Sequence, residues 1–139
     1  MKKNKVISLI LICLFSGAIA CTNYNLSTPS SDIIIIKYNT CKDLVFNKNG
    51  YKICVDSIWD SRCPTGAICI WAGVGEVKFK CSMNNNTEYN FKLATLSNGI
   101  YRTDTTINGI HFKLIDLTPY PSTAGINLSD YEIKFSISQ

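Results

Sequence analysis

The chain has 139 residues, with 14 Lys and Arg against 10 Asp and Glu. Three of the basic residues stand among the first five positions, so the rest of the chain carries 11 basic against 10 acidic residues and a net charge of about +1. This near-neutral balance excludes nucleic-acid binding and a polybasic membrane patch, because both need a basic surface.

The N-terminus has the three parts of a bacterial export signal. Lys2, Lys3 and Lys5 form a positive segment, and an apolar run over residues 6–15 follows it. The run is shorter than the roughly 20 residues that a permanent membrane-spanning helix needs. We therefore predict a signal peptide rather than a transmembrane segment.

Cys21 is the expected site of lipidation. The sequence Ala18-Ile19-Ala20-Cys21 resembles a lipobox, in which the cysteine is diacylated and becomes the first mature residue. Acyl chains hold a protein on a membrane by burying CH₂ groups. The residue after Cys21 is Thr22 and not Asp, which favours the outer membrane, with the domain facing the periplasm. The alternative is ordinary secretory cleavage after Ala20.

These features divide the chain into three parts. Residues 1–20 are the predicted lipoprotein signal peptide, and residues 21–31 are a polar stretch that is expected to be a flexible tether. Residues 32–139 are predicted to form a single β-domain. Without its first 20 residues the chain of 139 keeps 119, enough for one hydrophobic core.

Beyond Ile33 the apolar residues recur mainly at every second position, which is typical of β-strands. No stretch of the mature chain has a convincing helical stripe. Strands are expected around residues 33–36, 44–46, 51–55, 77–81, 89–93, 110–114 and 131–137, with a hairpin turn at residues 47–50. The sequence predicts an all-β fold, an antiparallel sandwich of seven or eight strands, with a barrel as the alternative. The sandwich is favoured because the irregular stretch from Pro119 to Gly125 resembles a Greek-key crossing.

Five cysteines remain after the signal and the lipidated residue are set aside, and an exported protein is expected to pair them. Cys63 and Cys69 enclose a Pro-Thr-Gly turn, which brings their Cα atoms within disulfide range. Strand alternation places Cys41 and Cys54 on one face of a hairpin, which predicts a second disulfide. Cys81 lies with the core residues and is expected to be free. A single β-bulge would reverse the alternation and allow Cys54 to pair with Cys81 instead.

The segment of residues 60–73, DSRCPTGAICIWAG, concentrates the residue types found at recognition sites. Asp60 is expected to accept backbone hydrogen bonds in the turn or to pair with Arg62. Trp71, Arg62 and Pro64 form a candidate recognition patch, together with Trp59, because Trp and Arg are frequent at binding hot spots. The competing interpretation is a turn clamp in which Trp71 packs on the disulfide. We expect Trp71 to be buried.

DSRCP, a short spacer and then C-x-W-A-G resembles a motif in a family of small, largely uncharacterised bacterial exported proteins and lipoproteins. The resemblance implies that the motif joins two strands of a β-domain. It also implies a Pro-Tyr-Pro segment and a Tyr-led final strand near the C-terminus, which correspond to residues 119–121 and Tyr131. It implies no established activity.

No catalytic set is recognisable in the sequence. His111 is the one histidine, and it stands between Ile110 and Phe112, where alternation turns it outward. A Cys–His nucleophile would need a free thiol of lowered pKa beside it, and Cys81 is predicted to be buried. We therefore predict no catalytic residues, no metal site and no cofactor.

The sequence favours an envelope-anchored lipoprotein with a non-catalytic binding or structural domain. Its expected partners are the membrane, through the N-terminal lipid, and an envelope protein. The alternative function is inhibition of a lysozyme or a protease. A more remote alternative is a Cys-dependent enzyme.

Overall fold

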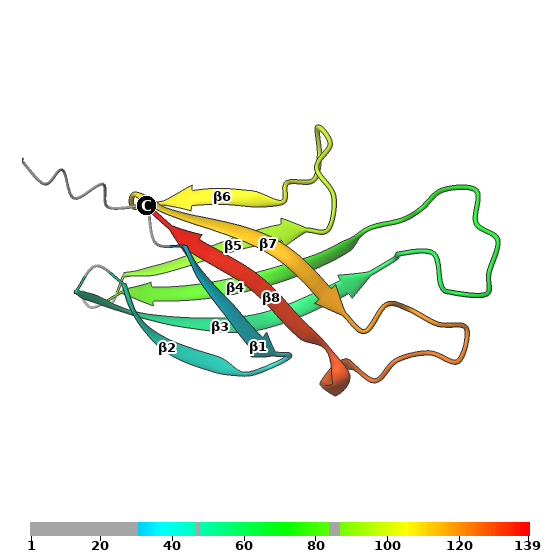
Figure 1. Cartoon of the computed structure of the whole chain (residues 1–139), viewed down its shortest axis with the longest axis horizontal. Coiled ribbons are helices and arrows are strands. Elements are labelled where there is room, and N and C mark those ends of the chain that lie inside the picture. Colours follow the sequence, from blue (N-terminus) through cyan, green and yellow to red (C-terminus); the bar gives the residue numbers. More distant parts are fainter. Residues whose placement is uncertain (1–30, 47, 84–86) are drawn as a thin grey trace, which may run out of the picture.

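The computed structural model describes residues 31–46, 48–83 and 87–139, and it shows two four-stranded antiparallel sheets packed into a sandwich (Figure 1). The strands are β1 (Asp32–Lys37), β2 (Cys41–Phe46), β3 (Asn49–Asp60), β4 (Gly75–Met83), β5 (Glu88–Ala94), β6 (Asp104–Ile107), β7 (Ile110–Thr118) and β8 (Glu132–Ser138). A short 3-10 helix, η1 (Leu128–Asp130), precedes β8. One sheet has the order β1-β8-β7-β6 and the other β2-β3-β4-β5. The predicted sandwich is confirmed, and the sheets do not close into a barrel.

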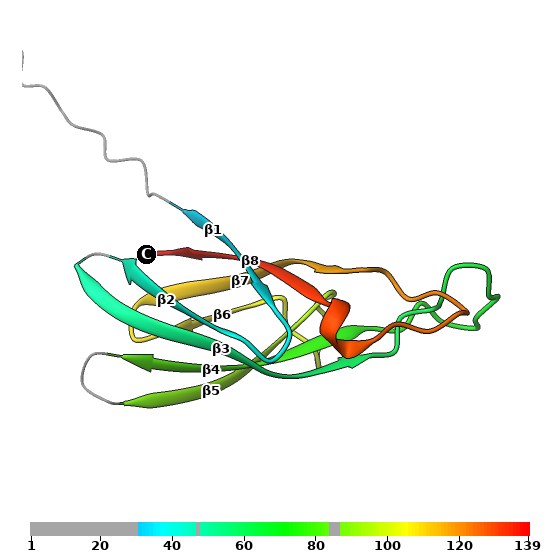
Figure 2. The ribbon, with the colours of Figure 1, turned by 90° about the horizontal axis from the view of Figure 1, so that it is seen from below.

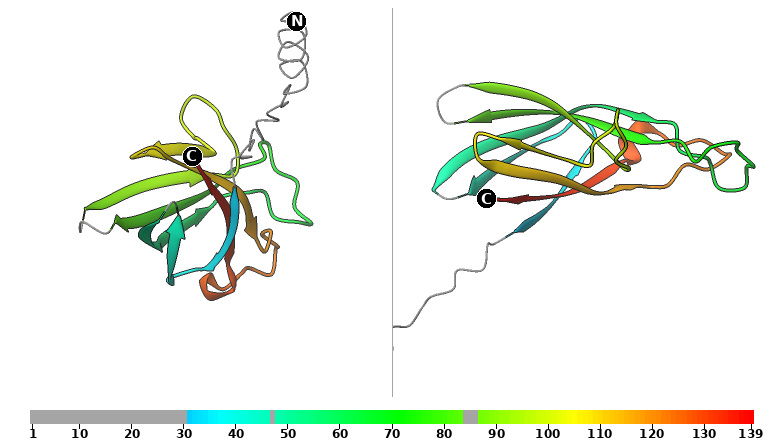
Figure 3. Two further views of the ribbon diagram at one scale, coloured as in Figure 1. Left: turned by 60° about the vertical axis from the view of Figure 1, so that its left-hand side comes forward. Right: turned by 90° about the horizontal axis from the view of Figure 1, so that it is seen from above.

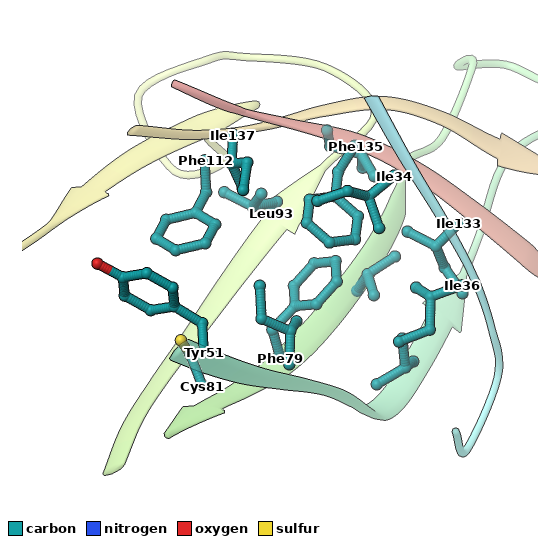
Figure 4. Packing of buried hydrophobic residues seen from close by; sticks show 14 of the residues in the cluster. Ile34, Ile36, Tyr51, Phe79, Cys81, Leu93, Phe112, Ile133, Phe135 and Ile137 are labelled. Carbon is teal, nitrogen blue, oxygen red and sulfur yellow. The ribbon is translucent and has the colours of Figure 1, made fainter. Parts of the chain in front are cut away.

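The core forms because alternate residues of each strand face the opposite sheet. Phe79 of β4 packs edge-on against Phe135 of β8, with ring centroids 5.4 Å apart, and so joins the two sheets. Phe91 stacks on Phe79 at 5.3 Å. Figure 4 shows Phe79 and Phe135 together with Ile34 and Ile36, which β1 adds from the edge. The Ile33–Ile36 run is accordingly an edge strand with one covered face, since Ile34 and Ile36 are buried while Ile33 and Ile35 are exposed.

The chain changes sheets twice, between β1 and β2 and again between β5 and β6. The stretch that begins at Pro119 is not a sheet crossing, because the strands it joins, β7 and β8, are neighbours in one sheet. The sandwich was therefore predicted correctly, but the Greek-key crossing expected from Pro119 to Gly125 was wrong. The long β7–β8 connection instead projects from one end of the sandwich (Figure 2).

Three local features differ from the expected pattern. Asn49 already belongs to β3 and pairs with Phe46, so the β2–β3 turn precedes the Asn-Gly pair. Strand β6, which was not expected, pairs with β7 through the tight turn at Asn108 and Gly109. A register shift in β3 falls between Val55 and Ser57, after Cys54, so the alternation that governs Cys54 is unaffected.

Truncating the inter-sheet contact is expected to destabilise the fold. Phe79→Ala removes a ring that is 1% exposed and should lower the free energy of unfolding by about 3–5 kcal/mol. Val45→Ala is the matched control, because Val45 is 79% exposed, and its loss should stay below about 1 kcal/mol. Urea unfolding monitored by tryptophan fluorescence measures both. Equal losses would contradict the burial of Phe79 in the core.

Candidate functional site

The segment of residues 60–73 connects β3 to β4 and extends their hairpin beyond the sheet. Ser61 N donates to Val74 O at 2.9 Å, and Cys63 N donates to Ala72 O at 2.8 Å. The disulfide between Cys63 and Cys69 then closes the far part, with the two Cα atoms 5.9 Å apart. We call residues 63–71 the disulfide loop. Its two ends are held by both backbone hydrogen bonds and a covalent bond.

Gly73 allows the two ends of the loop to approach each other. Its φ is +70°, and a Cβ at this position would lie 1.8 Å from the carbonyl oxygen of Ser61. Any other residue would therefore meet both a strained conformation and a backbone clash. The close approach of the Ser61 carbonyl is by itself enough to require glycine at position 73, the final Gly of the C-x-W-A-G motif.

Arg62 is the buried charge of the site, with 8% of its surface exposed. Its guanidinium forms a two-pronged pair with Asp60, with Nη2 2.6 Å from Oδ2 and Nε 2.9 Å from Oδ1. Nη1 donates to the carbonyl of Leu117 at 2.9 Å, and Nη2 donates to that of Pro119 at 3.1 Å. Arg62 therefore ties the end of β3 to the end of β7 in the other sheet.

Two tyrosines complete the surroundings of this pair. The hydroxyl of Tyr131, which stands just before β8, donates to Asp60 Oδ2 at 2.9 Å. The ring of Tyr120 lies 4.6 Å from the Arg62 Cζ, within cation–π range. Asp60 also accepts from the Arg62 backbone N–H at 3.1 Å. We call Asp60, Arg62 and Tyr131 the clamp.

Hydrogen bonds and opposite charges keep Asp60 and Arg62 of the clamp ionised. Burial alone would raise the pKa of Asp60, but hydrogen bonds from Arg62 and Tyr131 outweigh it and hold that pKa below its usual value. Burial opposes the charge of Arg62 as well, but the hydrogen bond to Asp60 raises its pKa. Burial and the bond to the Asp60 carboxylate raise the pKa of Tyr131 to about 12. The clamp is thus an ion pair with a neutral phenol at neutral pH.

The disulfide loop is also joined to the β7–β8 connection. We call residues 119–127 of that connection the proline loop. Thr65 N donates to the carbonyl of Pro121 at 2.8 Å, and Thr65 forms an isolated parallel bridge with Ser122. Figures 1 and 2 show the two loops projecting together from one end of the sandwich. They support each other beyond the edge of both sheets.

The disulfide loop exposes a group of apolar side chains. Ile68 and Ile70 are 105% and 107% exposed, and Trp71 is 65% exposed. We call these three residues the tip surface. The sequence from Cys63 to Gly73 contains no charged residue, so the tip is an uncharged apolar projection. Such a surface is typical of an interaction site.

The structure separates the predicted recognition residues into two groups. Asp60 and Arg62 are brought together, and Arg62 is buried, so its guanidinium is not presented on the surface. The expectation that Trp71 is buried was wrong, because the loop extends past the sheets that would cover it. Pro64 is half-buried and accepts a hydrogen bond from Ala67 N at 3.1 Å. Trp59 is exposed on β3.

Sequence reasoning did not assign Ile68, Ile70 or Tyr131 to the site. The two isoleucines stand between turn residues, outside any alternating strand. This position could have indicated that they do not face the core. Tyr131 is 71 positions from Asp60, and no local pattern links the two.

The remaining cysteines are arranged as the alternation indicated. Cys41 and Cys54 are directly paired across β2 and β3, and a disulfide joins them. In the described part of the chain Cys81 is the free cysteine, and it is buried. Burial raises the pKa of its thiol to about 11, the opposite of what a nucleophilic thiolate needs.

His111 lies on the outer sheet surface, away from the clamp. Its Nδ1 is 3.3 Å from Thr106 Oγ1, and its Nε2 is 3.4 Å from Asp104 Oδ2. Within the described residues no three His, Cys, Asp or Glu side chains gather as a metal site. Across the same residues no helix has the length and apolar character to cross a bilayer.

The predicted signal peptide, the lipidation of Cys21 and nearly all of the tether lie outside the described residues. Comparison of the chain with protein-family models, with curated proteins and with solved structures gives no match. The resemblance of the motif over residues 60–73 to exported bacterial proteins therefore stays a prediction.

Breaking the clamp is expected to cost much more than breaking a surface ion pair. Arg62→Met should lower the free energy of unfolding by about 3–5 kcal/mol, because it leaves the Asp60 carboxylate buried without its cation. The double variant with Asp60→Asn should recover part of that loss, since the unpaired charge is gone. Chemical denaturation of the single and double variants measures both effects. A loss under about 1 kcal/mol for the single variant would contradict a buried clamp.

The clamp also predicts a pH dependence. The folded state lowers the pKa of Asp60 from its usual 3.8, so the unfolded chain binds a proton first as the pH falls. The stabilisation is complete well above pH 4 and is lost below it, as the pH falls through the folded pKa. Unfolding free energies measured from pH 6 to pH 2.5 should therefore fall more steeply for the wild type than for Asp60→Asn. If the unfolding free energies of the wild type and of Asp60→Asn fell in parallel with pH, the ionisation of Asp60 would not be the cause of the decrease.

Proposed function

We propose that the protein is a non-catalytic binding protein, anchored to the cell envelope through acylated Cys21, that presents the tip surface to an envelope protein. The observation that carries this proposal is the exposure of Ile68, Ile70 and Trp71 on a covalently closed loop. Burying such a side chain contributes about 1.5–3 kcal/mol of favourable free energy, and the isolated domain does not gain this at these positions.

The rigidity of the loop supports a role in binding. Cys63–Cys69, the ladder at the ends of the loop and the contact of Thr65 with Pro121 restrict its backbone before any partner arrives. A restrained loop loses less conformational entropy on association than a free one. A tryptophan beside two isoleucines is a suitable anchor for a partner's apolar pocket.

The position of the tip favours a partner away from the anchoring membrane. Asp32 pairs with Ile137 at one end of β8, whereas Thr118, close to the clamp, pairs with Glu132 at the other end. The proposed lipid attachment therefore leads to the end of the sandwich opposite the tip (Figure 1). In a chain held through Cys21, the tip would lie at the end of the sandwich farther from the point where the tether enters it.

Inhibition of a lysozyme or a protease is the second candidate. It is favoured by the shape of the site, a convex disulfide-closed loop that projects from the domain and would complement a concave enzyme cleft. Stoichiometric inhibition of a purified enzyme would identify this case. Binding to a protein without enzymatic activity would exclude it.

Removing the apolar tip is expected to abolish binding and spare the fold. The double variant Ile68→Ser with Ile70→Ser changes two exposed residues, so its free energy of unfolding should stay within about 1 kcal/mol of wild type. Its affinity for the partner should fall at least about 100-fold, because two anchoring side chains are lost.

The measurement begins with a photoreactive side chain at position 70, in cells that produce the protein, and the crosslinked partner is then titrated against purified variants. Val45→Ser is the matched control, since Val45 is also highly exposed, at 79%, but lies on β2, outside the disulfide loop. Equal binding by the wild type and the double variant would overturn the proposal.

A further inference from the structure

A second site lies on the side of the sandwich where the two sheets part, between the edge strands β5 and β6 (Figure 3). A groove of about 550 Å³ is lined by residues 89–94 of β5, by Glu76 of β4, by Thr105 and Ile107 of β6, and by residues 100–102. From β6 only alternate residues line it, whereas every residue from 89 to 94 does. The groove is therefore bounded by the edge of β5 and the inner face of β6.

The backbone of β5 offers hydrogen-bonding groups to this groove. Thr95 N donates to Gly75 O and Met83 N donates to Thr87 O, so the odd-numbered residues at both ends of β5 bond toward β4. The β4–β5 register has no shift between them. Because the N–H and C=O of one residue point to the same side and alternate along a strand, Asn90 and Lys92 direct theirs into the groove.

At one end of the β5 edge, a backbone N–H is already bonded to a carbonyl outside the sheet, as it would be to an added strand. Ala94, the next even-numbered residue, donates its N–H to the carbonyl of Arg102 at 2.8 Å. In the described part of the chain no strand pairs with the remainder of this edge. The backbone groups of Asn90 and Lys92 are thus aligned for a strand that continues the contact begun by Arg102.

The walls of the groove define the side chains that such a strand would carry. Residues opposite Asn90 and Lys92 would face outward, and the residues between them would point between the sheets. There they would meet Phe91, which is half-buried, and Ile107. Lys92 is paired with Glu76 at 2.7 Å, while Arg102 makes no ion pair among the residues the structure describes. The groove therefore suits alternating apolar side chains with an acidic residue near Arg102.

We propose that this groove binds an extended peptide segment of another protein, which adds to the edge of β5 as an antiparallel strand. The peptide's outward residues exchange backbone hydrogen bonds with Asn90 and Lys92, and its inward residues are apolar. This site is separate from the tip surface, so the two would bind different parts of partners.

The probe is the blocked peptide Asp-Val-Thr-Val-Thr-Val-Thr, which places Val inward, Thr outward and Asp beside Arg102. Amide hydrogen exchange of the whole protein is followed by NMR with and without a saturating amount of peptide. Exchange at Asn90 and Lys92 should slow at least about tenfold, while Thr95, already bonded to Gly75, should not change. Unchanged exchange at Asn90 and Lys92 would overturn the proposal.

Two matched controls distinguish backbone pairing from nonspecific apolar binding. The same peptide N-methylated at its threonines keeps every side chain but loses the donors that face β5, and it should bind at least about tenfold more weakly. Asn90→Pro removes the donor that faces the groove without touching the β4–β5 ladder, and it should weaken binding, whereas Asn90→Thr should not. Equal binding of the methylated peptide would refute strand addition.

The remaining alternative is a second copy of the chain. Sedimentation velocity of the wild type and of Asn90→Pro tests it directly. A dimer that Asn90→Pro dissociates would show that the edge of β5 pairs with itself, and it would overturn the proposal of a foreign peptide. A monomer at all concentrations, together with slowed exchange on peptide addition, supports it.

Discussion

The buried pair of Arg62 and Asp60 is the contact on which the projecting end of the molecule depends. It is the point where the end of β3, the end of β7 and the start of the proline loop meet. A buried charge pair is tolerated only when its hydrogen-bonding groups are satisfied. Within the described residues every buried side-chain nitrogen and oxygen has a partner. Because guanidinium geometry is directional, this arrangement fixes where the two loops leave the sandwich, which apolar packing alone would leave less determined.

Much of the fold was predictable because strand alternation is a local signal. Residues such as Phe79 and Phe135 stand at every second position and face the core as expected. The same alternation paired Cys41 with Cys54, since the bulge of β3 falls after Cys54. Strand β6 was not predicted, because its four residues are mostly polar and its place depends on β7. The change of sheet after β5 is likewise a property of the whole fold.

The candidate site was predictable only in its local part. The disulfide of Cys63 with Cys69 and the pairing of Asp60 with Arg62 join residues a few positions apart. The acceptors at Leu117 and Pro119 lie 55 and 57 positions away, and short-range sequence patterns do not reveal such contacts. Trp71 was misplaced because a tryptophan next to a disulfide often packs on it. Whether it does depends on a covering layer, and here the loop extends beyond both sheets.

The loop combines two sets of residues that are under different constraints. Those that hold it, such as Cys63, Cys69 and Gly73, contact other parts of the chain, whereas Ile68 and Ile70 are fully exposed to solvent. Changes at Ile68 and Ile70 therefore leave folding nearly untouched and alter only what the loop can touch. The domain thus separates the residues that hold the loop in place from those that the loop exposes. The chemical character of the tip can therefore change through a few substitutions, without a compensating change elsewhere in the sandwich.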